Sequence, residues 1–293
     1  MTSSPRRRLL AYFARRPAAG SWALLTPGLL WLAAFFAVPL VVLLGYSVMH
    51  RGTYWGVAPG FTLEHYRRFL DPLYVAIAWR TLWIALATTG LCLVLSYPVA
   101  YVIARAGRWR NILLFLVILP FWTSFLIRTY AIIVLLRGGG VVNSTLMGLG
   151  VTTAPLELLY TPGAVLAGLV YGYLPFMVLP IYASLERLDL DLVDAAEVLG
   201  ARAFARFRRV ILPLSLPGVA AGSLLVFIPS LGAFLTPDLL GGAKTMMLGN
   251  LVQNQFGPAR NWPFGAAVSF ALMGVVMVGL LAWLRVRDAE AAA

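Results

Sequence analysis

The sequence is poor in the side chains on which metal sites and most catalytic sites depend. Its 293 residues include one cysteine, Cys92, and two histidines, His50 and His65. One cysteine cannot form an intrachain disulfide, and two histidines without a shared ligand spacing do not make a metal-binding set. No Ser/His/Asp grouping has a plausible setting either. We therefore expect no metal, no cofactor and no catalytic residue in this chain.

Charge is also scarce, because 12% of the residues are charged and 61% are hydrophobic. Soluble domains usually carry about 25% charged residues. A chain with this composition has more apolar surface than one globule can bury. The composition therefore predicts an integral membrane protein.

Six apolar runs each exceed the roughly 20 residues that a helix needs to cross the hydrocarbon of a bilayer. They predict an all-α membrane protein with transmembrane helices at 22–49, 73–104, 111–136 (bent at Pro120), 162–185, 214–235 and 263–284. The first run follows a basic segment, as in a secretory signal, but it is too long for a signal and no small-residue cleavage pattern follows it. We expect polar loops at 137–161 and 236–262.

The basic residues are unevenly distributed between the loops. Of the 23 Lys and Arg residues, 15 lie in the N-terminus, the 105–110 loop, the 187–213 loop and the C-terminal tail. Basic loops stay in the cytoplasm, so both termini and these loops are predicted to be cytoplasmic. The net charge of +12 then reports membrane topology and does not indicate nucleic-acid binding. We expect a cytoplasmic basic N-terminus at 1–21, a transmembrane permease domain at 22–284 and a cytoplasmic tail at 285–293.

The 187–213 loop is predicted to contain two short helices. Asp191 and Asp194 predict a capped N-terminus for the first, in a capping-box-like pair. Gly200 predicts its end, because glycine adopts the left-handed conformation most easily. A second short helix is expected at 203–209, and Pro213 and Pro217 are expected to fix the start of the fifth span.

This loop closely resembles the signature loop of ABC-importer permeases. The family pattern is Glu-Ala-Ala, three residues, Gly, nine residues, a branched apolar residue, one residue and Leu-Pro. It is matched here by Asp194, Ala195, Ala196, Gly200, Val210, Leu212 and Pro213. The one departure is Asp194, which is one methylene shorter than the usual Glu. An ordinary amphipathic loop would be the alternative interpretation.

The resemblance implies the type I ABC-importer permease fold, in which this loop forms a coupling helix that docks into a cytoplasmic ABC ATPase dimer. It implies ATPase-coupling roles for Asp194, Ala195, Ala196, Gly200, Arg206 and Pro213. Arg206, Arg208 and Arg209 are expected to pair with acids on the ATPase or with phosphates of membrane lipid.

A narrower resemblance covers roughly residues 60–270. Its stretches are 70–74, LPFWTSFLIRTY at 119–130, 169–189, DLLGGAK at 238–244 and NWPFGAA at 261–267. They resemble permeases of spermidine/putrescine importers. This implies a multi-pass protein of the bacterial inner membrane with a second homologous permease subunit and an extracytoplasmic solute-binding protein as partners.

Aromatic residues gather near prolines of the third and fourth spans. A pore lined by aromatic faces suits an organic cation, because ring quadrupoles attract ammonium groups. The expected substrate-path residues are Trp122, Phe125, Tyr171, Tyr173 and Asp238. For any one aromatic residue, packing or lipid contact is the alternative.

Arg128 lies inside the predicted third span, where a charge costs at least about 2.5 kcal/mol. It is expected to face protein or water, to snorkel outward, or to pair with a carboxylate such as Glu157. A direct substrate role stays open. An intramembrane arginine is awkward on a path for polycations, so an anionic or amino acid-like solute is the alternative substrate.

Small residues predict close helix packing in two spans. Gly168 and Gly172 form one small-xxx-small pair, and Gly218 and Gly222 form another. Each pair is expected to face either this chain's own helices or a partner subunit.

The GGAKT segment at 241–245 resembles the end of a phosphate-binding loop, but Ala243 occupies the position before the lysine that requires glycine. We therefore assign ATP hydrolysis to another polypeptide. A secondary transporter driven by an ion gradient is the alternative from another class. It would need intramembrane carboxylates, which the mid-span segments almost lack.

Overall fold

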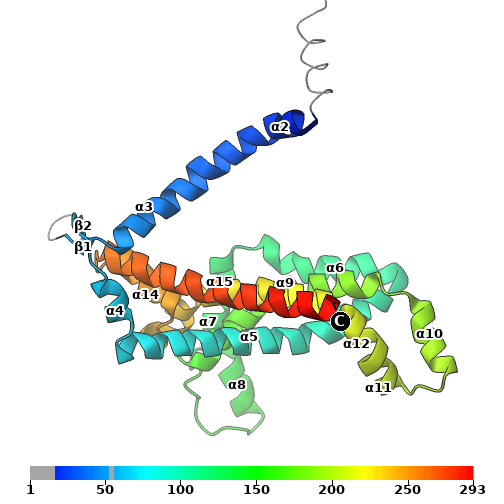
Figure 1. The fold of residues 1–293 in the computed structure, drawn as a ribbon. Coiled ribbons are helices and arrows are strands. Elements are labelled where there is room, and N and C mark those ends of the chain that lie inside the picture. Colours follow the sequence, from blue (N-terminus) through cyan, green and yellow to red (C-terminus); the bar gives the residue numbers. More distant parts are fainter. Residues whose placement is uncertain (1–16, 53–55, 293) are drawn as a thin grey trace, which may run out of the picture.

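The computed structural model describes residues 17–52 and 56–292, which are mostly helical (Figure 1). One antiparallel ribbon joins β1 (His50–Arg51) and β2 (Val57–Ala58). The α-helices are α2 (Pro17–Leu32), α3 (Val38–Ser47), α4 (Glu64–Phe69), α5 (Pro72–Arg105), α6 (Arg110–Ile118), α7 (Phe125–Leu136), α8 (Val141–Gly148), α9 (Pro162–Glu186), α10 (Leu190–Val198), α11 (Ala203–Arg206), α12 (Leu212–Leu231), α13 (Leu235–Gly241), α14 (Leu248–Phe256) and α15 (Trp262–Ala292). Short 3-10 helical segments are η2 (Gly107–Trp109), η3 (Leu119–Trp122) and η5 (Gly242–Lys244). Short π-helical segments are η1 (Ala33–Ala37) and η4 (Phe207–Ile211).

Six helical stretches of the described residues are long and apolar enough to cross a membrane. They are Leu24–Ser47, Pro72–Arg105, Phe125–Gly148, Pro162–Glu186, Ala203–Leu231 and Trp262–Leu281. The predicted number of spans is confirmed. The longest single helix is α5, with 34 residues.

The third span differs from the sequence prediction. Instead of one helix bent at Pro120, α6 and α7 are separated by the 3-10 turn η3 and by two residues with extended ψ angles, Thr123 and Ser124. The Thr123 side chain donates a hydrogen bond to the Pro120 carbonyl at 2.7 Å. Because this carbonyl accepts its hydrogen bond within the turn, it does not continue the α-helical hydrogen-bond pattern. Helix α7 therefore begins as a separate helix.

The predicted polar loops also contain helices that the sequence prediction missed. The 137–161 loop contains α8, and the 236–262 loop contains α13, η5 and α14. Asn143 on α8 is fully buried and fixes the first loop, because its side chain bonds both the N–H and the carbonyl of Leu156.

The core of the bundle is built around α9, the most buried of the six spans, which packs against α5 and α12. A Cβ at Gly218 on α12 would lie 2.5 Å from the Pro180 carbonyl of α9, and one at Gly222 would lie 2.8 Å from the Met177 sulfur. Gly168 and Gly172 likewise face Leu240, Thr236 and Phe125 of this chain. All four glycines therefore serve packing within the chain.

The first span lies apart from the rest of the bundle. Figure 1 shows α2 extending away while the end of α3 meets α15, and α3 and α15 are in contact. The most apolar window of Leu24–Ser47 has no buried residue. This long apolar surface therefore has little contact with the chain's own core.

Candidate coupling site

Helix α10 projects from one end of the bundle, next to α11 and near the far end of α15 (Figure 1). Its N-cap is Asp189, whose side-chain oxygen accepts a hydrogen bond from the Asp191 N–H at 3.0 Å. The prediction that Asp191 caps this helix is wrong by two residues, because Asp191 already lies in the first turn. Its carboxylate still lies at the positive end of the helix dipole.

The predicted stop at Gly200 is confirmed. Gly200 has a φ of +79°, in the region that favours glycine. The Gly200 N–H bonds the Glu197 carbonyl at 2.8 Å, and the Ala201 N–H bonds the Ala196 carbonyl at 3.0 Å. These two bonds form a Schellman motif, which satisfies the last carbonyls of α10.

An ion pair ties α10 to the segment that follows it. Arg206 on α11 bonds the carboxylate of Glu197 on α10. The Arg206 side chain is 22% exposed and that of Glu197 is 63% exposed. From its place in the sequence, Arg206 was expected to pair with an ATPase acid or a lipid phosphate. In the structure, Arg206 instead pairs with Glu197 of the same loop, while Arg208 and Arg209 stay exposed.

The predicted second short helix is not separate from the fifth span. Helix α11 continues through the π-helical turn η4 directly into α12, so Ala203–Leu231 is one helical stretch. Pro213 lies inside this stretch, just after the π-helical turn η4, so it does not begin a separate helix. Because the stretch is continuous, a displacement of α11 passes directly into the fifth span.

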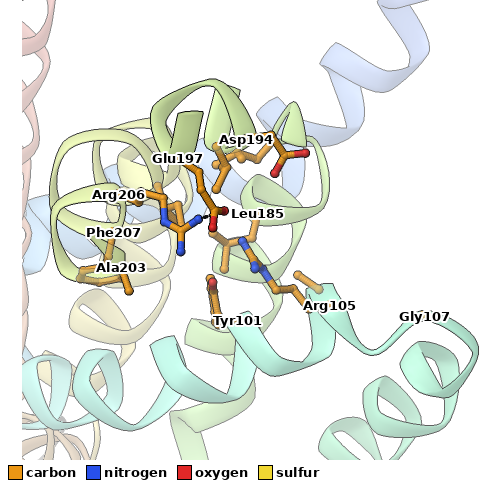
Figure 2. Close-up of a pocket in the computed structure, with 13 residues that line it drawn as sticks. Tyr101, Arg105, Gly107, Leu185, Asp194, Glu197, Ala203, Arg206 and Phe207 are labelled. Carbon is orange, nitrogen blue, oxygen red and sulfur yellow. Dashed lines mark hydrogen bonds and ion pairs between the residues drawn. The ribbon is translucent and has the colours of Figure 1, made fainter. Parts of the chain in front are cut away.

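A pocket of about 570 Å³ lies beneath α10. It is lined by Tyr101, Ala104, Arg105, Gly107, Leu185, Leu188, Val193, Asp194, Glu197, Ala203, Arg206, Phe207 and Ile211. Figure 2 shows Glu197 and Arg206 meeting across it, Arg105 pointing into it, and the Asp194 carboxylate directed away from that pair. The Arg105 guanidinium also lies 4.6 Å from the Tyr101 ring centre.

Three exposed apolar side chains at the end of α10 and on α11 were not predicted from the sequence. Val198 is 88% exposed, Leu199 is 87% exposed and Phe204 on α11 is 73% exposed. Apolar side chains gathered on an otherwise polar end of the molecule are typical of an interaction site. The signal in the sequence is the apolar pair directly before Gly200. Ala195 is also exposed and Ala196 is half-buried.

The predicted substrate-path residues do not form one group. Phe121 and Phe176 pack edge to face at 5.1 Å, and Tyr173 lies 6.3 Å from Phe176. Trp122 packs instead against Phe115, at 5.6 Å, and is 75% exposed. Asp238 is exposed in the first turn of α13, and Tyr171 is also exposed.

Arg128 lies among the aromatic side chains of this region. Its guanidinium carbon is 4.8 Å from the Phe121 ring centre and 5.6 Å from that of Phe125. Two of its nitrogens, Nε and Nη1, are buried without a hydrogen-bond partner. Within the described part of the chain it makes no ion pair, so the expected pairing with Glu157 is absent. The rings of Phe121 and Phe125 are therefore already in contact with a cation of the chain itself.

Comparison with known proteins extends these observations. Residues 93–287 match the family described as "Binding-protein-dependent transport system inner membrane component". The chain is 45% identical over 256 residues to the spermidine/putrescine transport system permease protein PotB of Escherichia coli (strain K12), covering 87% of this chain and 93% of that protein. PotB of Haemophilus influenzae is 43% identical over 258 residues, covering 88% of this chain and 90% of that protein.

A solved structure supports the fold. A bacterial ABC transporter involved in the import of the acidic polysaccharide alginate has a chain that matches with a TM-score of 0.68 at 18% identity, covering 96% of this chain and 99% of that chain. This chain therefore belongs to the family of inner membrane components of binding-protein-dependent transport systems, as a multi-pass permease subunit of the ABC importer type.

Proposed function

We propose that this permease takes up polyamines, spermidine and putrescine, in a transporter whose ATP is hydrolysed by a separate cytoplasmic ATPase dimer. The observation that carries the proposal is the 45% identity to PotB, which extends over 93% of that permease. The other subunits are a second homologous permease and an extracytoplasmic solute-binding protein.

In this proposal α10 is the element that docks on the ATPase. Its exposed apolar end at Val198 and Leu199 supplies contact area, and Asp194, Ala195, Ala196 and Gly200 shape the docking surface. The Glu197–Arg206 pair holds α10 against α11. Closure of the ATPase dimer then displaces α10 and α11 together, and the continuous helix from Ala203 to Leu231 carries the displacement into the membrane.

The proposed topology places both termini, the 105–110 loop and α10 in the cytoplasm of a bacterial cell, with the permease domain at 22–284. In support, the α5–α6 connection, α10 and the far end of α15 gather at the same end of the bundle (Figure 1). Of the 23 Lys and Arg residues, 15 lie in the N-terminus, the 105–110 loop, the 187–213 loop that contains α10 and the C-terminal tail, as expected for cytoplasmic segments.

A small anionic solute is a second candidate substrate, and Arg128 favours it. Its buried nitrogens, which have no partner among the described residues, could donate hydrogen bonds to an anion, and the charge of the guanidinium would repel a polycation. A molybdenum transport system permease protein, ModB of Mycobacterium bovis, is 30% identical to this chain over 203 residues. The two candidates differ in the charge of the solute, so one transport assay separates them.

The test uses the transporter assembled from all its subunits in proteoliposomes, with the binding protein and labelled spermidine, putrescine, molybdate or amino acids outside. We expect ATP-dependent accumulation of spermidine or putrescine that a proton ionophore does not abolish. Accumulation of molybdate alone would overturn the polyamine proposal. Uptake that requires an ion gradient and no ATP would overturn the importer mechanism.

A further inference from the structure

A groove lies between α5 and α6, near the connection that joins them. It has a volume of about 400 Å³ and is lined by Pro98, Val99, Val102, Ile103, Leu113, Leu116 and Val117. Every lining residue is apolar, and Val102 and Leu116 are 59% and 54% exposed. The groove therefore favours an apolar occupant.

The segment that connects the two walls of the groove is positively charged. Residues 98–117 contain three arginines but no Asp or Glu. Two of these arginines are engaged within the chain, because Arg110 pairs with Glu186 at 2.5 Å and Arg105 lies over Tyr101 in the pocket beneath α10. Arg108 is exposed, and no ion pair to it occurs among residues 17–52 and 56–292. It offers a cation to a group outside the chain.

Trp109 links this cation to the groove. It is the N-cap residue of α6 and precedes Leu113 of the groove wall by four residues, so it lies just beyond the end of the groove. Its ring is 54% exposed, and the Arg108 guanidinium lies 5.5 Å from the ring centre. An exposed tryptophan beside an arginine is typical of the level of the lipid headgroups.

We propose that this groove is a binding site for one anionic phospholipid. An acyl chain fills the apolar wall from Val102 to Leu116, the phosphate lies at Arg108, and Trp109 packs at the glycerol level. The combination of an apolar groove, an interfacial ring and an unpaired cation matches all three parts of such a lipid. Basic sites between membrane helices on the cytoplasmic side bind anionic headgroups in the same way.

The site also borders the coupling pocket. Arg105 ends α5 three residues after Val102, and it lines the pocket beneath α10. A lipid held in the groove therefore fixes the connection that forms one wall of that pocket. The lipid composition of the membrane can therefore affect the position of the coupling element, whichever solute is carried.

The test is native mass spectrometry of the assembled, full-length transporter titrated with phosphatidylglycerol or phosphatidylcholine. We expect the wild type to retain phosphatidylglycerol preferentially. Arg108→Gln should weaken its binding about fivefold, the factor that corresponds to about 1 kcal/mol per arginine near a lipid surface. Arg108→Lys should bind almost normally. Val102→Trp, which fills the groove, should weaken binding of the lipid without a change of charge.

Arg285→Gln is the matched control, because it removes an equally exposed positive charge from the end of α15. Equal binding of the two lipids by the wild type would overturn the proposal, as would equal losses in Arg285→Gln and Arg108→Gln. If Val102→Trp detaches another subunit while phosphatidylglycerol binding is kept, the groove is a protein interface and the lipid assignment is wrong. The exposed Arg108 variants keep the test independent of any folding defect in Val102→Trp.

Discussion

Gly200 ends α10 because its φ angle is positive. A side chain at this position would strain the backbone without crowding any neighbouring atom. Its φ is +79°, yet a Cβ placed there meets nothing within 4 Å. Gly200→Val should therefore cost about 1–2 kcal/mol through the left-handed backbone alone. We expect this variant to hydrolyse ATP in proteoliposomes while its solute uptake falls several-fold.

Gly200→Asn is the control for that experiment, because asparagine tolerates the left-handed region better than β-branched residues do. It should keep most of the uptake. Normal uptake by Gly200→Val at normal abundance in the membrane would contradict a role for this helix end in coupling.

The pair of Glu197 and Arg206 predicts a non-additive double-mutant cycle. If Arg206 acts by holding α10, Glu197→Gln and Arg206→Gln should impair uptake to a similar degree, and the double variant should be no worse than either. The pair is partly exposed, so its direct contribution to stability is about 0.2–1 kcal/mol. Uptake that falls in Arg206→Gln and stays normal in Glu197→Gln would instead indicate that Arg206 contacts the ATPase.

At the scale of elements, the contact between α9 and α12 depends on the absence of a side chain at Gly218. A Cβ there would lie 2.5 Å from the Pro180 carbonyl and 2.7 Å from the Ser184 Cβ. Gly218→Ala should therefore destabilise the protein by about 1–3 kcal/mol, as overpacking does, and lower the melting temperature of the purified transporter. Gly274→Ala on α15 meets nothing within 4 Å, so helix propensity should make it neutral or slightly stabilising. Equal melting temperatures for the two variants would contradict this packing role.

The sequence predicted the six spans because apolar length is a property of single segments. It also predicted the end of α10, since Gly200 carries its own conformational preference. The break at Thr123 and Ser124 was missed because neither residue is a strong helix breaker, and only Pro120 was visible as a bend. Helices α8, α13 and α14 were missed because each is short and is flanked by glycine, which favours a loop.

The details of the coupling site were predictable only in part. Asp189 and Asp191 are equally suited to cap a helix, so the sequence alone did not show which of them lies outside the first turn. The Glu197–Arg206 pair joins residues on two helices whose relative angle is set by Gly200 and Ala201. The spacing of Glu197 and Arg206 in the sequence therefore did not identify them as an ion pair. The placement of Arg128 over Phe121 and Phe125 likewise depends on the break before α7.

For the whole molecule, the separate first span predicts a contact with the proposed second permease. Phe36 is 64% exposed, and the native Cys92 is fully buried, so a cysteine at position 36 can be labelled selectively. We expect Phe36→Cys, labelled with maleimide-benzophenone and irradiated, to cross-link to the second permease in the assembled transporter. Ala266→Cys, at a fully buried position, should give no such product. Cross-linking of Phe36→Cys to lipid alone would show that this surface faces the bilayer.

The length of α5 has a consequence for where the ATPase can reach the protein. A helix of 34 residues extends about 51 Å, whereas the hydrocarbon layer is about 30 Å thick. Even with a tilt of about 40°, roughly two turns of this helix must lie outside the hydrocarbon layer. If these turns include Arg105 at the end of α5, the pocket beneath α10 opens at the membrane surface, where a soluble ATPase can contact it without entering the hydrocarbon layer.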